Sequence, residues 1–294
     1  MSPARTALFI LTTILALYAA LVAYVYVFQS QLVFLPEIGG RALRGTPANI
    51  GLAFEELRIP TPDGVTLHAW YIRGEPGAAT VLFCHGNAGN ISDRLEWAKI
   101  LRDMGLGVLL FDYRGYGQST GIPEERGIHE DARAVWDHLT SKERISPSRI
   151  VIFGESLGGA VAAHLAKDVT PAALIVHSAF TSVPDVASRF YWYLPVRLLA
   201  RIRLPTADYI ERVRAPVLII HSRDDEIVPF SHAQTLLRRA NDPKELIAIE
   251  GDHNTGFLLS EEKVREGLRR FVNAHGLRGE LSPPASAAFR PTDP

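Results

Sequence analysis

Short unbroken runs of apolar residues recur along the chain from residue 79 onward, and segments with apolar positions at steps of three and four separate them. Such runs predict buried strands, and such steps predict amphipathic helices. We expect strands at 79–84, 108–111, 149–154, 172–177, 215–221 and 245–251, and helices at 91–105, 128–142, 157–168 and 260–276. The alternation predicts an α/β fold with a mostly parallel, doubly wound sheet that helices cover on both faces.

A hairpin precedes this alternating part of the chain. Residues 54–74 read as two strands joined at Pro62-Asp63-Gly64, a turn sequence. The ligand site of such a sheet lies at the carboxyl ends of the parallel strands, so the loops that follow them are where candidate chemistry is expected.

The N-terminus carries a different pattern, because Ala7 to Phe28 contains 22 residues and no charge. At about 1.5 Å per residue this run can cross a bilayer core of about 30 Å. A cleaved signal peptide is the alternative, but its apolar region is only roughly 7 to 15 residues long. Length favours a retained single-pass anchor in a lipid bilayer. Arg5 precedes the run and Arg41 and Arg44 follow it, which leaves the orientation open. We expect a cytoplasmic N-terminus and a non-cytoplasmic domain.

These patterns divide the chain into an anchor (1–34), a linker (35–53), a globular domain (54–277) and a proline-rich tail (278–294) that we expect to be disordered. Within the domain, residues 178–212 interrupt the alternation and hold an aromatic block at 190–194. This insertion reads equally well as a small lid or as a packed helix.

Composition excludes some classes of function. The 31 basic and 32 acidic residues nearly cancel, which gives no electrostatic case for a nucleic-acid partner. Cys84 is the single cysteine, so neither an internal disulfide nor a cysteine-rich zinc site is possible. The 47% hydrophobic content is sufficient for a large core.

One serine lies where a predicted strand passes into a predicted helix, in Gly154-Glu155-Ser156-Leu157-Gly158. A serine there is an ordinary helix N-cap. The strand before it, the helix after it and the flanking glycines also fit a nucleophile elbow, a sharp turn in which a Cβ would obstruct the close approach of strand and helix. A capping serine alone needs no such glycines.

A serine nucleophile requires a histidine base and a carboxylate that orients it. Asp224 and Asp225 follow the predicted strand at 215–221, and His253 follows the strand at 245–251. The order serine, acid, histidine is the one that this architecture predicts.

At this point the chain resembles the α/β-hydrolase superfamily, from about residue 54 to about residue 277. The resemblance is carried by "HGNAGN" (85–90), "DYRGYGQSTG" (112–121), "GESLGG" (154–159), "HSRDDEIVP" (221–229) and "GDHN" (251–254). It is greatest to serine hydrolases with one N-terminal anchor and a minimal lid, which include depalmitoylases and esterase-like proteins. The resemblance implies that Ser156 is the nucleophile, Asp225 the acid and His253 the base.

Stabilisation of an oxyanion needs donors, and the backbone N–H groups of Asn87 and Leu157 are the natural pair. Because the donor of Asn87 is its backbone, sequence reasoning gives its side chain little importance. The expected activity is cleavage of carboxylic esters or thioesters of lipophilic small molecules or acylated proteins, without a cofactor. A peptidase or an acyltransferase with the same triad, or a catalytically silent membrane scaffold, are alternatives. The sequence does not indicate an oligomeric state.

For the other candidate polar residues, structural roles explain the sequence better than chemical ones. His85, His177 and His221 follow or end predicted strands, but ordinary loop contacts explain them better than a metal site. Asp112 and Arg114 are expected to fix loop structure. Asn90-Ile91-Ser92 matches a glycosylation sequon beside the candidate oxyanion loop, where a glycan would not fit.

Overall fold

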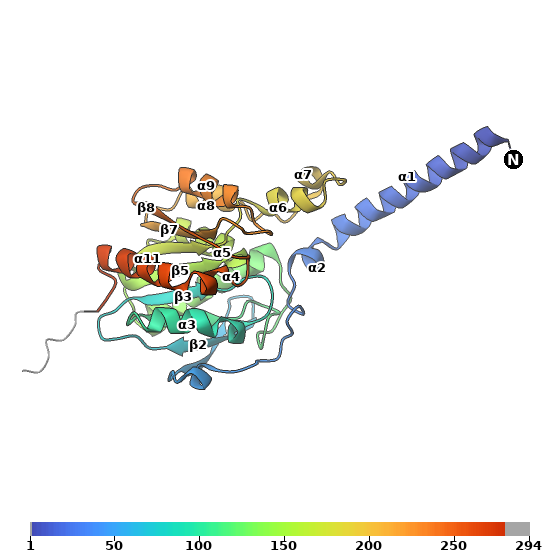
Figure 1. Cartoon of the computed structure of the whole chain (residues 1–294). Coiled ribbons are helices and arrows are strands. Elements are labelled where there is room, and N and C mark those ends of the chain that lie inside the picture. Colours follow the sequence, from blue (N-terminus) through green and yellow to red (C-terminus); the bar gives the residue numbers. More distant parts are fainter. Residues whose placement is uncertain (1, 280–294) are drawn as a thin grey trace, which may run out of the picture.

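An eight-stranded sheet forms the centre of the computed structural model, which describes residues 2–279 (Figure 1). The tail expected at 278–294 lies outside the described residues except for its first two positions. The strands are β1 (Glu55–Pro60), β2 (Thr66–Ile72), β3 (Thr80–Cys84), β4 (Gly107–Phe111), β5 (Ile150–Glu155), β6 (Ala173–His177), β7 (Val217–Ser222) and β8 (Lys244–Ile249).

The spatial order of the strands is β1-β2-β4-β3-β5-β6-β7-β8. The predicted hairpin β1–β2 pairs antiparallel, β2 joins β4 antiparallel, and all other neighbours are parallel. The predicted mostly parallel sheet is therefore confirmed. Because the parallel strands end at one edge, the loops after β3, β5, β7 and β8 gather there.

Helices connect and cover the strands. The helices are α1 (Pro3–Val27), α2 (Gln29–Val33), α3 (Leu95–Arg102), α4 (Glu125–Asp137), α5 (Leu157–Asp168), α6 (Val183–Phe190), α7 (Val196–Leu199), α8 (Thr206–Ile210), α9 (Phe230–Arg239), α10 (Gly256–Leu259) and α11 (Glu261–Ala274). Shorter 3₁₀ turns occupy Pro47–Ile50, Ile91–Arg94 and Pro147–Arg149, and a π turn occupies His138–Lys142.

Two apolar cores lie on opposite faces of the sheet. Helices α3 and α11 cover one face, where Trp97 and Phe271 are buried. Helices α4, α5, α8 and α9 cover the other face, where Val135 and Leu236 are buried. Strand β5 supplies both cores, since Ile152 faces one and Phe153 the other, which is the alternation of a strand covered on both sides.

Helix α1 extends away from the domain (Figure 1). It has 25 residues, a mean hydropathy of 2.4 in its most apolar window and no buried side chain, so it is long and apolar enough to cross a membrane; a signal sequence has the same properties. Its continuation α2 returns to the domain, where Phe34 is buried in the core.

The insertion at 178–212 contains the three short helices α6, α7 and α8. Helix α8 packs beside α5, and Ile210 is buried there. Helices α6 and α7 project from the same side of the domain as α1 (Figure 1), and Trp192 between them is 82% exposed. The insertion therefore combines the two readings: its C-terminal part is packed, and its N-terminal part projects.

Candidate active site

Ser156 lies on the turn between β5 and α5, with φ 51° and ψ −112°. A positive φ is rare for a residue with a Cβ and stores roughly 1–3 kcal/mol of strain. The side chain of Ser156 accepts no hydrogen bond from the start of α5, so it is not a helix cap. The strained turn is the elbow that the sequence predicts.

The glycines around Ser156 are required by close backbone contacts. A Cβ on Gly154 would overlap the carbonyl of Gly158. A Cβ on Gly158 would overlap the carbonyls of Cys84 and His85, at the end of β3. These positions let α5 begin directly against the neighbouring loop, which explains why glycine precedes and follows the serine at two-residue spacing.

The structure brings Ser156, His253 and Asp225 together in line. Nε2 of His253 is 3.0 Å from Oγ of Ser156, and Nδ1 of His253 is 2.8 Å from Oδ2 of Asp225. When Nδ1–H donates to Asp225, Nε2 is free to accept the Ser156 proton. His253 and Asp225 are both buried. This is the geometry that a nucleophile, a base and an orienting acid need.

The loop after β7 selects Asp225 over Asp224. Oδ1 of Asp225 accepts the backbone N–H groups of Ile227, at 3.0 Å, and Val228, at 2.6 Å. Burial alone would raise the pKa of the Asp225 carboxyl, but the His253 hydrogen bond and charge and the Val228 N–H outweigh it and lower that pKa. Asp225 is thereby kept ionised, while Asp224 turns to the backbone of Gly251.

The candidate oxyanion donors follow adjacent strands. Cys84 of β3 pairs with Gly154 of β5, and Asn87 and Leu157 each come three residues later at the same edge. Within residues 2–279, neither of these two backbone N–H groups has a hydrogen-bond partner. Two free N–H groups beside the nucleophile suit a developing negative charge.

The side chain of Asn87 holds the segment that follows the apolar helix, a role that sequence reasoning missed. Its Nδ2 donates to the carbonyl of Val33 at 2.6 Å, and its Oδ1 accepts the Leu35 N–H at 3.1 Å and the Tyr116 hydroxyl at 2.8 Å. Leu35 also forms a parallel bridge with Ala88. The candidate oxyanion loop is therefore fastened to the chain that leaves α1.

A second brace links this loop to the elbow. Nε of Arg94 lies 2.6 Å from Oε2 of Glu155, the residue before Ser156, and both side chains are largely buried. Nη2 of Arg94 donates to the carbonyl of Ala88 at 3.1 Å. Burial would raise the pKa of the Glu155 carboxyl, but the charge of Arg94, followed by those of nearby histidines including His253, lowers it. No pattern in the sequence predicts this pairing.

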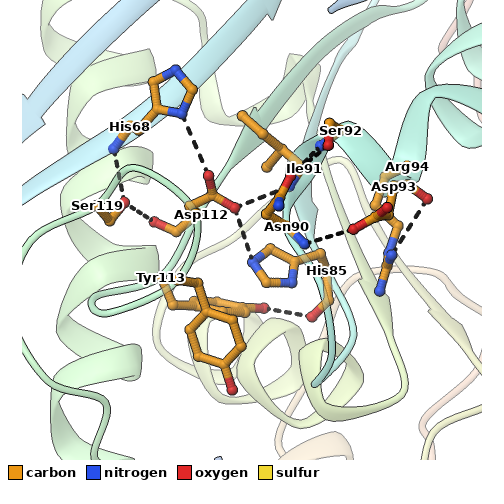
Figure 2. A network of polar contacts seen from close by, with 12 residues as sticks. His68, His85, Asn90, Ile91, Ser92, Asp93, Arg94, Asp112, Tyr113 and Ser119 are labelled. Carbon is orange, nitrogen blue, oxygen red and sulfur yellow. Dashed lines mark hydrogen bonds and ion pairs between the residues drawn. The ribbon is translucent and has the colours of Figure 1, made fainter. Parts of the chain in front are cut away.

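Asp112 organises the loops beneath these groups (Figure 2). Its Oδ1 accepts the Ile91 N–H at 2.9 Å, its Oδ2 lies 3.4 Å from Nδ1 of His68, and its carbonyl accepts the Ser119 hydroxyl at 2.7 Å. Oδ1 is also 3.7 Å from Nε2 of His85. These contacts agree with the expected structural role of Asp112.

Arg114 also stays within the scaffold, because its Nε donates to Asp131 at 2.9 Å and its Nη1 to Asp63 at 2.7 Å. Burial raises the pKa of Asp131 to about 6 although Arg114 opposes the shift. Asn90 is fully buried and its side chain donates to the carbonyls of Gly40 and Ala42, so the sequon has no room for a glycan.

The three histidines considered for a metal site have separate surroundings. His85 contacts Gly86 and Asp112, His177 packs edge-on against Trp97, and Nε2 of His221 is 2.7 Å from the carbonyl of Val228. Among residues 2–279 no group of three histidine, cysteine or acidic side chains is arranged to hold a metal ion.

A hollow of about 630 Å³ lies between the insertion and α9. Its lining includes arginines and aspartates and none of the three triad residues; the charged members are Asp185, Arg197, Arg203, Asp208 and Arg239. Such a lining does not suit an acyl chain.

Comparison with known proteins gives the family. Residues 75–207 match the family described as serine aminopeptidase, S33. An uncharacterized protein of Mycobacterium tuberculosis strain H37Rv is 38% identical over 271 residues, covering 91% of this chain and 95% of that protein. The alpha/beta hydrolase domain-containing protein WAV2 of Arabidopsis thaliana is 38% identical over 239 residues, covering 74% of this chain and 78% of that protein.

Solved structures show the same fold at lower identity. An esterase of Pyrococcus furiosus superposes with a TM-score of 0.67 at 21% identity, covering 79% of this chain and 94% of the esterase. An alpha-beta hydrolase of Vibrio vulnificus superposes with a TM-score of 0.69 at 18% identity, covering 82% and 91%. The sheet order, the elbow and these relatives together place the chain in the α/β-hydrolase superfamily, to which it belongs.

Proposed function

We propose that the protein is a membrane-anchored serine hydrolase that cleaves carboxylic esters or thioesters through an acyl-enzyme on Ser156. The observation that carries the proposal is the continuous contact from Ser156 through His253 to Asp225, at 3.0 Å and 2.8 Å. The family match and the esterases among the structural relatives support hydrolase activity.

Acylation follows from this geometry. Oγ of Ser156 attacks the substrate carbonyl carbon while its proton passes to Nε2 of His253. The resulting imidazolium is stabilised by the ionised Asp225 at Nδ1. The oxyanion accepts hydrogen bonds from the backbone N–H groups of Asn87 and Leu157. Leu157 is the first residue of α5, whose dipole favours negative charge at its N-terminus. His253 then returns the proton to the leaving alcohol or thiol, and the acyl group remains on Ser156.

Deacylation repeats these steps with water. His253 removes a proton from a water molecule, the hydroxide attacks the Ser156 ester, and the same two backbone N–H groups hold the second oxyanion. Collapse of this intermediate releases the carboxylic acid and returns the proton to Ser156. The two half-reactions require only these protein groups and water.

Contacts at the end of α1 support a retained anchor rather than a cleaved signal. Gln29 is buried, its Nε2 donates to the carbonyl of Leu199 at 2.6 Å, and its Oε1 accepts the N–H of Arg201 at 2.8 Å. Within α1, the hydroxyl of Tyr18 donates to the carbonyl of Tyr193 at 2.9 Å. Cleavage beyond Gln29 would remove all three contacts.

An anchor that keeps the site near a bilayer favours lipophilic substrates, either lipids or acylated proteins. We place the N-terminus on the cytoplasmic side and the domain on the other side, because Arg5 precedes the apolar run. Protease digestion of sealed membrane vesicles tests this orientation. In right-side-out vesicles the added protease should degrade the domain, and in inverted vesicles the membrane should protect the domain.

A substrate panel tests the reaction class. The full chain in detergent should hydrolyse esters and thioesters, with rates that rise with acyl length, and Ser156→Ala and His253→Ala should each lose at least about a thousandfold in kcat. Activity retained by Ser156→Ala would contradict the proposal.

Peptidase activity is a second candidate, because the matched family is described as serine aminopeptidase. Amides and peptides in the same panel distinguish it, and an acyl acceptor alcohol distinguishes an acyltransferase. A protein that turns over none of these substrates and does not react with a serine-directed probe would instead be the silent scaffold.

A further inference from the structure

The part of the insertion that projects from the domain has an unusual surface. Residues 186–203, the aromatic arm, contain five exposed large apolar side chains: Phe190, Tyr191, Trp192, Tyr193 and Leu198. Trp192 is 82% and Leu198 87% exposed. The exposed residues are clustered on one short segment, whereas exposed apolar residues that need no explanation are scattered singly.

The charge of the arm fits an anionic surface. Residues 186–203 contain four arginines and no acidic residue, so the net charge is +4. All four arginines are exposed: Arg189, Arg197, Arg201 and Arg203. Arg197 pairs with Asp185 just outside the arm, and Arg201 lies over the ring of Tyr26 at 5.3 Å. Tryptophan, tyrosine and arginine together are typical of protein surfaces at the boundary of headgroups and acyl chains.

The arm lies directly beside the helix proposed as the anchor. Tyr18 contacts it through the Tyr193 carbonyl, and the Arg201 guanidinium donates to the carbonyl of Tyr26 at 3.3 Å. Figure 1 shows α6 and α7 on the side of the domain from which α1 extends. The arm therefore lies along the C-terminal part of α1 and contacts it.

The position of these contacts along α1 indicates how deep in a bilayer the arm would lie. Tyr18 lies nine residues before the end of α1 at Val27, which is about 14 Å along the helix axis. The polar layer of one leaflet is only roughly 5–8 Å thick. A bilayer that surrounds α1 thus reaches the arm at the level of Tyr193 when Val27 lies at the membrane surface.

We propose that the aromatic arm is a second membrane contact, which inserts into the boundary between headgroups and acyl chains beside α1. The inference rests on the membrane anchoring proposed above. It adds that the bilayer, not a protein partner, covers the arm, because the arm contacts the only described helix that can span a membrane.

The insertion that carries the arm begins close to the candidate site. The chain enters the arm from β6, and Ala179 at the start of the insertion lies where a Cβ on Gly159 of α5 would meet it. The insertion that leads into the arm therefore begins beside the helix that starts directly after Ser156.

Trp192 provides a built-in probe. The chain has four tryptophans, and the other three, Trp70, Trp97 and Trp136, are buried in the domain. We suggest reconstituting the full chain in phosphatidylcholine–phosphatidylglycerol vesicles whose lipids carry bromine on the upper acyl carbons. Flotation of the vesicles reports anchoring, and bromine quenching reports contact of tryptophan with lipid.

The expected result is flotation with quenching that is lost in Trp192→Phe. A protein that floats but shows the same quenching as Trp192→Phe would overturn the proposal while leaving the anchor intact. Trp192 shielded from both bromine and an aqueous quencher would mean that protein covers the arm, which also overturns it. A protein that does not float contradicts anchoring itself, and activity on a soluble ester tells whether the hydrolase proposal fails with it.

A functional comparison uses two substitutions at one position. Trp192→Phe should keep activity toward a vesicle-embedded long-chain ester, whereas Trp192→Glu should lower its kcat/KM about tenfold. Both variants should act on a water-soluble short ester as the parent does, because Trp192 belongs to neither the triad nor the oxyanion loops. Equal activity of both variants on the embedded ester would contradict a membrane role.

Discussion

The loop after β3, which lies beside Ser156, and the aromatic arm are held in different ways. The loop after β3 is fastened by buried polar groups, with Asp112 below it, Arg94 across to the elbow and Asn87 out to the chain leaving α1. The aromatic arm has exposed apolar side chains; one buried side chain, Gln29, binds it, and it contacts α1 through the bonds of Tyr18 and Arg201. One side is built to fix backbone N–H groups before a substrate arrives, and the other presents a surface to its surroundings.

The largest contrast should come from the same substitution on the two sides. Asp112→Ala leaves the Ile91 N–H and two histidines without their buried partner, so the free energy of unfolding should fall by about 3–5 kcal/mol. Asp185→Ala near the arm removes contacts to Thr181 and Arg197 that are partly exposed, and should cost less than about 1 kcal/mol. Denaturant unfolding of the detergent-solubilised chain measures both; equal losses would remove the distinction.

Acid should destabilise the folded domain at His177, whose backbone carbonyl accepts the N–H of Ser156 at 2.8 Å. Burial lowers the pKa of His177 from 6.5 to about 4, so the folded state resists a proton that the unfolded chain accepts. The contribution of neutral His177 to the free energy of unfolding is intact above pH 6.5 and is lost as the pH falls toward 4. At 1.36 kcal/mol per pKa unit, the loss is about 3 kcal/mol.

The measurement is the free energy of unfolding between pH 7 and pH 4 for the parent and His177→Gln. Other carboxyls and histidines also titrate in this range, so the variant serves as the reference. We expect a shallower slope for the variant, and identical slopes would exclude His177 as the source.

Loosening the candidate oxyanion loop should lower catalysis more than stability. Asn87→Ala removes the bonds to Val33 and Leu35, and should reduce kcat on a soluble ester on the order of ten- to a hundredfold with little change in KM, because the Asn87 N–H acts only on the oxyanion. Tyr116→Phe, which removes one hydroxyl from the same cluster, should have a smaller effect in the same direction. A change confined to KM would indicate a binding role instead.

The smallest expected effect is a gain in the stability of the folded state. Ser156 has φ 51°, which glycine adopts without strain, so Ser156→Gly should raise the free energy of unfolding by about 1 kcal/mol over Ser156→Ala while both variants are inactive. Thermal unfolding in detergent compares the two variants. Equal stability would mean that the elbow stores no measurable strain.

Local patterns predicted the parts of the fold and site that depend on near neighbours. The strand at 149–154, the glycine-flanked turn and the helix at 157–168 agree with β5, the elbow and α5 to within one residue. Asp225 and His253 lie together as expected because each follows a strand whose apolar run is unmistakable.

The missing parts depend on distant contacts or weak patterns. The bonds of the Asn87 side chain to Val33 and Leu35 join residues more than 50 positions apart, and Arg94 and Glu155 are 61 positions apart. No local spacing predicts such contacts. The predicted helix at 128–142 ends at Asp137 and continues as a π turn, and α9 was not predicted because two of its ten residues are buried. Helix ends and helices with a narrow apolar stripe are the least visible in sequence.

The central claim is that Ser156 is a nucleophile activated by His253. The most direct measurement is mass-spectrometric mapping of the full chain after reaction with a fluorophosphonate. We expect one phosphonylated residue, Ser156, with labelling abolished in Ser156→Ala and strongly slowed in His253→Ala. Labelling of another serine, or equal labelling of the parent and Ser156→Ala, would contradict it.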